Sequence, residues 1–215
     1  MIRLHSYWRS TAAYRVRIAL NLKNLDYELM PVHLVRDGGE QHKPAFRGLN
    51  PQGRVPLLEH DGTRISQSLA IVEYLDEVFK EPPLLPDDAH GRARVRSLAQ
   101  LVACDIHPLN NLSVLAYLKG EFGADKDQVG EWYGHWIEQG FTALEQRLNS
   151  EDAGGEFCHG ARPGIADLCL VPQVYNARRF NIDIGSYHRI LEIDSACMAL
   201  PAFQRAAPER QPDAE

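Results

Sequence analysis

Residues Ser10–Leu20 have the sequence STAAYRVRIAL and follow a short apolar segment, residues 2–7. Ser10 and Thr11 place two hydroxyl groups where a strand would be followed by a helix. Hydroxyl side chains are favoured there because they accept hydrogen bonds from the N–H groups of the first helical turn. The same N–H groups and the helix dipole favour negative charge, so this stretch predicts a site for an anion.

The periodicity of the stretch leaves helix and strand open. Val16, Ile18 and Leu20 alternate with polar or small residues, as in a half-buried strand. Tyr14, Ile18 and Leu22 equally fit one face of a helix. The residue pattern alone does not decide between the two.

Length and composition describe an ordinary globular chain of 215 residues, 44% hydrophobic and 24% charged. No apolar run approaches the roughly 20 residues that span a bilayer, and the N-terminus lacks a secretory h-region, so we expect no membrane partner and no export.

The four cysteines form no C-x-x-C pair, and Cys104 with His107 would supply only two ligands. We therefore expect no metal site and a reducing, cytoplasmic location.

The net charge of −6 is unevenly distributed along the chain. Up to Leu85 there are 11 Lys/Arg and 10 Asp/Glu, and beyond it 12 and 19. An acidic second half argues against a nucleic-acid partner.

A cluster of three prolines, Pro82, Pro83 and Pro86, indicates a stiff linker over residues 82–88. It separates a predicted α/β domain, residues 1–81, from a predicted all-helical domain, residues 89–215. The first domain has four expected strands, residues 2–7, 27–33, 56–60 and 64–65, and two expected helices, about 13–24 and 69–79. The second has expected helices over about 90–119 with a kink at Pro108, 129–148, 165–179 and 187–198, and a loose tail from Ala206.

Arg9–Leu20 resembles the block Arg-Ser-Ser-Cys-x-Trp-Arg-Val-Arg-Ile-Ala-Leu of the zeta-class glutathione transferases, the maleylacetoacetate isomerases. Thr11 stands for the second serine and Ala12 for the cysteine. The order of elements over nearly the entire chain is also similar to that family. The resemblance favours a helix after Ser10, and it implies a thioredoxin-like α/β domain followed by an all-α domain (the glutathione transferase fold), glutathione dependence and a homodimer.

Two further motifs carry the resemblance. Asn50–Pro56 is similar to the family's N-P-x-x-x-V-P, in which the Val–Pro bond is cis and the valine main chain pairs with glutathione. Gln67–Ile71 is similar to Q-S-L-A-I, where the serine and the helix N-terminus receive the γ-glutamyl carboxylate. Alone, each motif could be an ordinary turn or helix cap. Together they imply glutathione contacts from Gln52, Val55, Gln67 and Ser68.

A third match, Gly160–Asp167, departs from the family's helix-capping motif. Gly164 occupies the position of the family's Ser/Thr cap, which breaks the reciprocal capping box with Asp167. Glycine costs only a few tenths of a kcal/mol at this position. We expect Asp167 to be structural and the change to lower stability slightly.

The resemblance assigns the central role to Ser10. A free thiol has a pKa of about 8.5, and lowering it by one to two units needs roughly 1.4–2.7 kcal/mol. One hydrogen bond to a charged group contributes about 1.5–3 kcal/mol, so the Ser10 hydroxyl could hold the glutathione thiolate. Thr11 is the alternative donor, and a plain N-cap is the alternative role for either residue. Ala12 offers no polar group beside the sulfur.

The implied reaction is a cis–trans isomerisation. The thiolate adds to a maleyl double bond conjugated to a ketone, the resulting single bond rotates, and elimination leaves the fumaryl product. Such a site must hold a small dicarboxylate diketo acid and stabilise enolate charge, which favours arginines. The catalytic and substrate-binding candidates are Arg9 and Arg179. Arg15 and Arg17 are expected on the outer or domain-facing sides of the helix, and Arg178 in solvent.

Residues 105–111, sequence DIHPLNN, could bring His107 to glutathione and Asn111 to the substrate. The related maleylpyruvate isomerases have a similar Ile-His-Pro-x-Asn-Asn run but continue with two arginines, whereas Leu112 and Ser113 follow here. This difference favours maleylacetoacetate over maleylpyruvate as the substrate. Two functions of other classes stay open: a general glutathione transferase that uses Ser10 on α-halo acids, and a non-enzymatic scaffold of the same fold.

Overall fold

The computed structural model describes residues 1–151 and 154–215. Its contacts form two compact units: residues 1–84 together with 198–215, and residues 85–197. The first boundary lies within the expected 82–88 linker. Residues 198–215, expected in the all-helical domain, pack instead with the α/β unit.

The first unit contains one four-stranded sheet, with strand order β2-β1-β3-β4. Its strands are β1 (Ile2–Ser6), β2 (Glu28–Pro31), β3 (Leu57–His60) and β4 (Thr63–Ser66). β1 runs parallel to β2 and antiparallel to β3, and β3 is antiparallel to β4. All four predicted strands are present with slightly different bounds. Asp61 and Gly62, both with positive φ, form the hairpin turn between β3 and β4.

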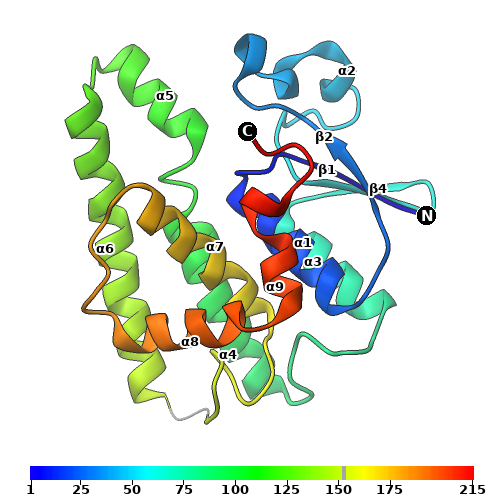
Figure 1. Cartoon of the computed structure of the whole chain (residues 1–215), viewed down its shortest axis with the longest axis vertical. Helices are drawn as coiled ribbons and strands as arrows, with labels where there is room; N and C mark the ends of the chain where they lie inside the picture. The colour runs from blue at the N-terminus through cyan, green and yellow to red at the C-terminus, as the bar shows by residue number, and fades with distance from the viewer. Residues whose placement is uncertain (152–153) are drawn as a thin grey trace. The chain divides into compact units, whose positions relative to one another are not determined.

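Helices α1 (Thr11–Leu22) and α3 (Ser68–Val78) lie side by side, and α9 (Pro201–Ala206) packs on α1 (Figure 1). Most of α1 is buried, including Val16, Ile18 and Leu20. A helix covered on several sides needs no single apolar stripe, which explains why its sequence also fits a strand. The helix predicted by the resemblance is confirmed, and it begins directly after Ser10.

The first unit also contains an apolar cluster of buried side chains: Tyr7, Trp8, Val32, Phe46, Val55 and Leu57. Phe46 comes from the short helix α2 (Pro44–Arg47). The C-terminal tail packs on this cluster through Ala214. The tail makes a 3₁₀ turn, Pro208–Arg210, and Gln211 is buried. The prediction of a loose tail is therefore wrong, because residues far away in the sequence provide its partners.

The second unit is helical. Its elements are α4 (Ala89–Gln100), a π-helical segment η3 (Leu101–Ile106), α5 (Leu112–Glu121), α6 (Lys126–Ser150), α7 (Ile165–Arg179) and α8 (His188–Met198), whose last residue belongs to the first unit. Helix α7 is buried along most of its length and contacts α4 and η3.

The predicted kinked helix over residues 90–119 is wrong in detail. The His107 N–H bonds the Val102 carbonyl, five residues back, and the chain then leaves the helix before α5 starts at Leu112. Pro108 follows at once and has no N–H with which to continue the ladder. The segment therefore contains a π-helical turn and then an interruption of the helix, where we expected a continuous helix with a kink at Pro108.

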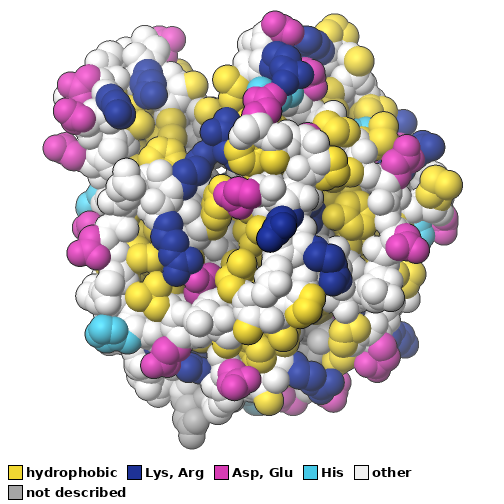
Figure 2. Space-filling model, in the orientation of Figure 1, with side chains coloured by type: hydrophobic (Ala, Val, Ile, Leu, Met, Phe, Trp, Pro, Cys, Tyr) yellow, Lys and Arg dark blue, Asp and Glu magenta, His cyan; other side chains and the backbone are white. Residues whose placement is uncertain are grey.

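Within the described residues, no helix is long and apolar enough to cross a bilayer. Side chains of both charge signs are interspersed over the face shown in Figure 2.

Candidate functional site

Ser10 caps helix α1 through its side-chain oxygen, and its hydroxyl group remains available as a hydrogen-bond donor. Its Oγ accepts a hydrogen bond from the Ala13 N–H at 3.2 Å, and its own N–H donates to the Tyr7 carbonyl at 2.9 Å. A hydroxyl has one donor and two acceptor positions, so accepting from Ala13 leaves the O–H to donate to a ligand. Thr11, the alternative donor, is the first helical residue and is buried.

Arg9 lies in the loop between β1 and α1. Its guanidinium carbon is 4.6 Å from the centre of the Trp8 ring, and Nη2 donates to the Tyr7 hydroxyl at 3.0 Å. The side chain is half-buried. Contacts with aromatic rings fix its position without neutralising its charge, so Arg9 can attract an anion beside Ser10.

The buried side chain of Arg17 contacts the loop between β1 and α1, which carries Arg9, from the interior of the first unit. Its guanidinium is fully buried and donates to Ser6 Oγ at 3.1 Å, the Trp8 carbonyl at 2.9 Å and the Ala206 carbonyl at 3.0 Å. The expectation that Arg17 lies on an outer or domain-facing side of the helix is wrong. These carbonyl and hydroxyl oxygens compensate for the loss of hydration that burial imposes on the cation.

The Val55–Pro56 bond is cis, as the resemblance implies. It directly precedes β3, and Val55 is buried. Two of the expected glutathione contacts meet beside it, since Gln67 Nε2 donates to Gln52 Oε1 at 3.1 Å. Gln67 has φ 71°, a left-handed conformation that a non-glycine residue seldom adopts and that often marks a functional site.

Ser68 is the first residue of α3 and not its cap, because Gln67 occupies the cap position. Ser68 Oγ accepts a hydrogen bond from Arg15 Nη1 at 3.1 Å, and both side chains are buried. Arg15 was expected on an outer or domain-facing side, so this expectation is also wrong. A buried guanidinium at the start of a helix adds to the positive end of the helix dipole, which strengthens a site for a carboxylate.

In the second unit, His107 and Asn111 flank Pro108. Asn111 caps α5, because its Oδ1 accepts from the Ser113 N–H at 3.1 Å and from the Ser113 hydroxyl at 2.9 Å. Its amide N–H groups have no partner among the residues that the structure describes, so they can donate to a ligand. The His107 side chain is half-buried.

Arg179 lies at the end of α7 and is exposed. Its guanidinium carbon is 4.7 Å from the centre of the Phe180 ring, which stacks on the ring of Tyr133 in α6 with centroids 3.7 Å apart. The neighbouring Arg178, expected in solvent, has a half-exposed side chain that pairs with the buried carboxylate of Asp194 at 2.7 Å.

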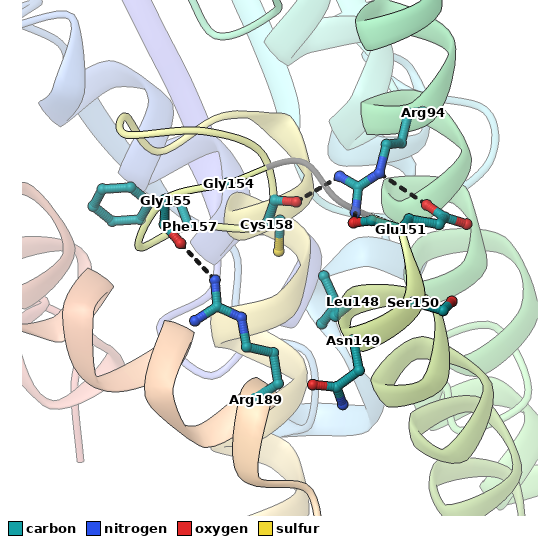
Figure 3. A pocket seen from close by; sticks show the side chains of 10 residues that line it. All are labelled: Arg94, Leu148, Asn149, Ser150, Glu151, Gly154, Gly155, Phe157, Cys158 and Arg189. Atoms are coloured by element: carbon teal, nitrogen blue, oxygen red, sulfur yellow. Dashed lines mark hydrogen bonds and ion pairs between the residues drawn. The ribbon is translucent and has the colours of Figure 1, made fainter.

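A cavity of about 240 Å³ in the second unit contains none of the predicted site residues (Figure 3). Arg94 and Arg189 lie on opposite sides of it. Arg94 donates to the Cys158 carbonyl at 2.6 Å and pairs with Glu151, and Arg189 donates to the Gly155 carbonyl at 2.7 Å. These arginines hold the surrounding loop in place, so we do not assign the cavity a ligand.

Known proteins resemble the chain over its whole length. Residues 4–83 match the family "Glutathione S-transferase, N-terminal domain". A maleylacetoacetate isomerase of Pseudomonas aeruginosa is 50% identical over 213 residues, which cover 99% of this chain and 98% of that protein. The chain belongs to the maleylacetoacetate isomerase family.

Solved structures narrow the family to a class. The holo structure of a maleylpyruvate isomerase, described as a bacterial glutathione S-transferase in the zeta class, has a TM-score of 0.96 and 48% identity, covering 99% of this chain and all of that one. A maleylacetoacetate isomerase of Methylobacterium extorquens AM1 with bound malonate and glutathione has a TM-score of 0.95 and 44% identity, with 99% of both chains covered. This zeta-class chain therefore has the predicted glutathione transferase fold.

This zeta-class transferase departs from the family pattern at Ala12 and Gly164. Glycine has no side chain to cap α7, yet half of the capping box remains, because the Asp167 carboxylate accepts from the Gly164 N–H at 2.8 Å. Its other oxygen accepts from the Cys158 N–H, also at 2.8 Å. Burial raises the pKa of Asp167, and the two N–H donors counteract this effect.

Sequence reasoning missed the contact that Arg15 makes in this zeta-class transferase. Arg15 lies inside the motif that indicates the family, but nothing in a one-dimensional pattern shows that its guanidinium reaches Ser68, 53 positions away.

Proposed function

We propose that this chain catalyses the glutathione-dependent cis–trans isomerisation of maleylacetoacetate to fumarylacetoacetate. The observation that carries the proposal is the Ser10 hydroxyl, which caps α1 as an acceptor and keeps its proton for a thiolate. Relatives named maleylacetoacetate isomerase, and the glutathione bound in the relative from Methylobacterium extorquens AM1, support it.

The residues of the first unit fit glutathione. Ser68 and Arg15 at the start of α3 suit a carboxylate, the Val55 main chain beside a cis proline suits a peptide, and the Ser10 hydroxyl suits a thiolate. Gln52 and Gln67 would hold the rest of the tripeptide. Bound glutathione supplies the thiolate that adds reversibly to the cis double bond. The protein's part is to stabilise that thiolate, for which one hydrogen bond from Ser10 is sufficient.

The acid substrate requires cations and polar donors. We assign Arg9 and Arg179 to its carboxylates and to the negative charge that develops on the neighbouring ketone oxygen. Asn111 supplies amide N–H donors to the substrate, and His107 contacts glutathione. The Trp8 ring and the Tyr7 hydroxyl hold Arg9, and the Phe180 ring holds Arg179. Neutral partners leave that charge available to an anion.

The choice of substrate rests on the segment after Asn111. Leu112 and Ser113 replace the two arginines of the related maleylpyruvate isomerases, which favours the larger diketo acid. Maleylpyruvate is the second candidate, supported by the maleylpyruvate isomerase of 48% identity.

We further propose that residues 1–81 supply most of the contacts to glutathione and residues 89–215 most of those to the acid, and that the protein is a cytoplasmic homodimer. All four cysteines are free, which is typical of a reducing compartment. Family membership supports the dimer. Light scattering tests it, because a monomer has a mass of 24.2 kDa and a dimer twice that mass.

Proton NMR of the vinyl region tests the activity directly. Purified protein is incubated with maleylacetoacetate or maleylpyruvate, each with and without glutathione. We expect a trans-coupled product only when glutathione is present, and faster conversion of maleylacetoacetate. Faster conversion of maleylpyruvate would overturn the substrate choice. No conversion of either acid would overturn the isomerase and favour a general transferase or a scaffold.

A further inference from the structure

Two tryptophans on α6 differ in what their indole N–H groups contact. Trp132 Nε1 donates to the Leu109 carbonyl at 2.8 Å. Trp136 follows one turn later, and its ring meets that of Trp132 edge-on with centroids 5.6 Å apart. The Nε1 atom of Trp136 is buried and has no hydrogen-bond partner among the residues that the structure describes. Of two neighbouring, half-buried indoles, one therefore bonds to the segment that leads to Asn111 and the other does not.

That segment is a turn between η3 and α5, residues 108–111. The Asn110 N–H bonds to the His107 carbonyl at 3.2 Å, and the Asn111 N–H bonds to the Pro108 carbonyl at 3.3 Å. Both distances lie at the long end of N–H···O hydrogen bonds, and Pro108 has no N–H to add another. Local bonds alone hold this turn weakly.

Helix α6 supplies the stronger anchors of the turn. Trp132 bonds to Leu109 through its indole, and the next residue, Tyr133, accepts at its carbonyl from Asn110 Nδ2 at 3.1 Å. The Asn110 side chain is buried, so the second bond is shielded from water. Two consecutive residues of α6 thus fix two consecutive residues of the turn, directly before Asn111.

The two candidate residues beside the turn depend on it differently. His107 is held by its own helix, because its N–H bonds to the buried Val102 carbonyl at 3.0 Å within η3. Asn111 lies beyond the turn, at the start of α5, and Leu115 is the only buried residue of that helix. We therefore expect a loss of the Leu109 anchor to displace Asn111 more than His107.

We propose that Trp132 is a positioning residue, which holds the turn so that the Asn111 amide donates to a carboxylate of the acid substrate. The inference rests on the proposed function, because it assumes that Asn111 faces this substrate. Trp132 acts through the Leu109 carbonyl and is itself assigned no contact with the acid.

Trp132→Phe removes the indole N–H and keeps an aromatic ring. At saturating glutathione we expect the KM for maleylacetoacetate to rise about tenfold, because a hydrogen bond to a charged carboxylate weakens steeply when its donor is misplaced. The kcat should stay within about twofold and the KM for glutathione should not change, since His107 keeps its bond to Val102.

Trp136→Phe is the matched control. It makes the same change of side chain one turn away on the same helix, but the N–H that it removes has no partner among the described residues. Its KM values should equal those of the wild type. The proposal is overturned if the two variants behave alike.

A second variant tests the anchoring of the turn independently of any tryptophan. Asn110→Ala removes the other hydrogen bond to α6 and should also raise the KM for the acid without changing the KM for glutathione. An unchanged KM for the acid would show that the anchors from α6 do not govern Asn111, which would overturn the proposal.

A double-mutant cycle separates positioning from general structure. Asn111→Ser keeps a side-chain oxygen to cap α5 and removes the amide N–H donors. If Trp132 acts through Asn111, Trp132→Phe has no further effect on an Asn111→Ser background. Independent, additive effects would show that Trp132 acts by another route and would overturn the proposal.

Binding of maleate, a cis dicarboxylate, distinguishes this proposal from the proposed function. Calorimetry on the glutathione-loaded protein needs no turnover, so it remains informative even if the wild type isomerises neither acid. We expect Trp132→Phe to weaken maleate binding about tenfold and Trp136→Phe to leave it unchanged. Unchanged binding in Trp132→Phe would overturn the positioning role, whatever the activity assay shows.

Discussion

Ser10 serves two purposes with one oxygen atom. Its lone pair accepts from Ala13 and caps α1, and its proton remains available for a ligand. A threonine could do the same, whereas an alanine could do neither. The observed role in folding and the proposed role in chemistry are therefore combined in one side chain, and we expect a substitution to affect both.

Ser10→Ala should reduce isomerase turnover by roughly a hundredfold, the effect typical of removing one donor to a developing or stabilised anion. It should also lower the free energy of unfolding by about 1 kcal/mol through loss of the cap. Glutathione should still bind, as calorimetry can measure. Thr11→Ala is the comparison and should retain most activity. Wild-type turnover in Ser10→Ala would rule out Ser10 as the thiolate donor.

Arg15 and Ser68 should behave as one unit towards glutathione. Arg15→Met and Ser68→Ala each remove one side of the 3.1 Å hydrogen bond, so we expect each to raise the KM for glutathione about tenfold. The KM for the acid should change little. Steady-state kinetics with each substrate varied in turn distinguishes the two effects. An unchanged KM for glutathione in both variants would contradict the proposed carboxylate site.

Glu59 provides a test of pH dependence. A hydrogen bond from His5, 2.7 Å away, holds the pKa of Glu59 below its ordinary value of 4.5. The ionised carboxylate therefore stabilises the fold above that pH, and the contribution is lost as the pH falls through the native pKa. Urea unfolding between about pH 3 and pH 7 should show wild type more stable than Glu59→Gln at the upper end only. A constant difference would argue against this linkage.

At the scale of elements, α7 begins with an incomplete cap and compensates through Asp167. The carboxylate bonds the N–H groups of Gly164 and Cys158 and so ties the preceding loop to the helix. The bond from Cys158 is buried and the bond from Gly164 is partly buried, and an unsatisfied N–H is costly where water is excluded. The loss of a serine cap is thus balanced by a carboxylate that was already present at the third helical position.

Asp167→Ala should lower the free energy of unfolding by about 2–4 kcal/mol, because one buried and one partly buried N–H group lose their acceptor. The KM values for glutathione and acid should not change. Asp127→Ala, in the first turn of α6 and exposed, is the control and should have little effect. Chemical denaturation measures both. Equal stability of the two variants would contradict the structural role of Asp167.

At the scale of the whole molecule, the chain's last residues support the loop that presents Arg9 and Ser10. Asp213 Oδ2 accepts from the Trp8 N–H at 3.0 Å, a contact between residues 205 positions apart. Glu215 pairs with Arg36 and His33 at the surface. The tail therefore belongs to the first unit, although the helical unit separates the two in sequence.

Asp213→Ala should destabilise the protein by about 1 kcal/mol and weaken glutathione binding several-fold, because the Trp8 main chain loses its acceptor two residues before Ser10. Glu215→Ala removes a surface ion pair from the same tail and should change neither property. Thermal unfolding and glutathione calorimetry test both variants. Equal behaviour of the two would show that the tail does not support the loop.

The sequence alone determined most of the elements and the local motifs. The cap at Ser10 and the start of α3 near Ser68 depend on neighbouring residues, which a linear pattern contains, whereas the cis Val55–Pro56 bond followed from the family resemblance. Only the tertiary structure decided which arginines are buried, where the tail packs and what holds Arg179. Arg15 and Arg17 look like surface residues until oxygens from distant segments compensate for their lost hydration. Such compensation depends on which residues the fold brings together, and periodicity carries no information about that.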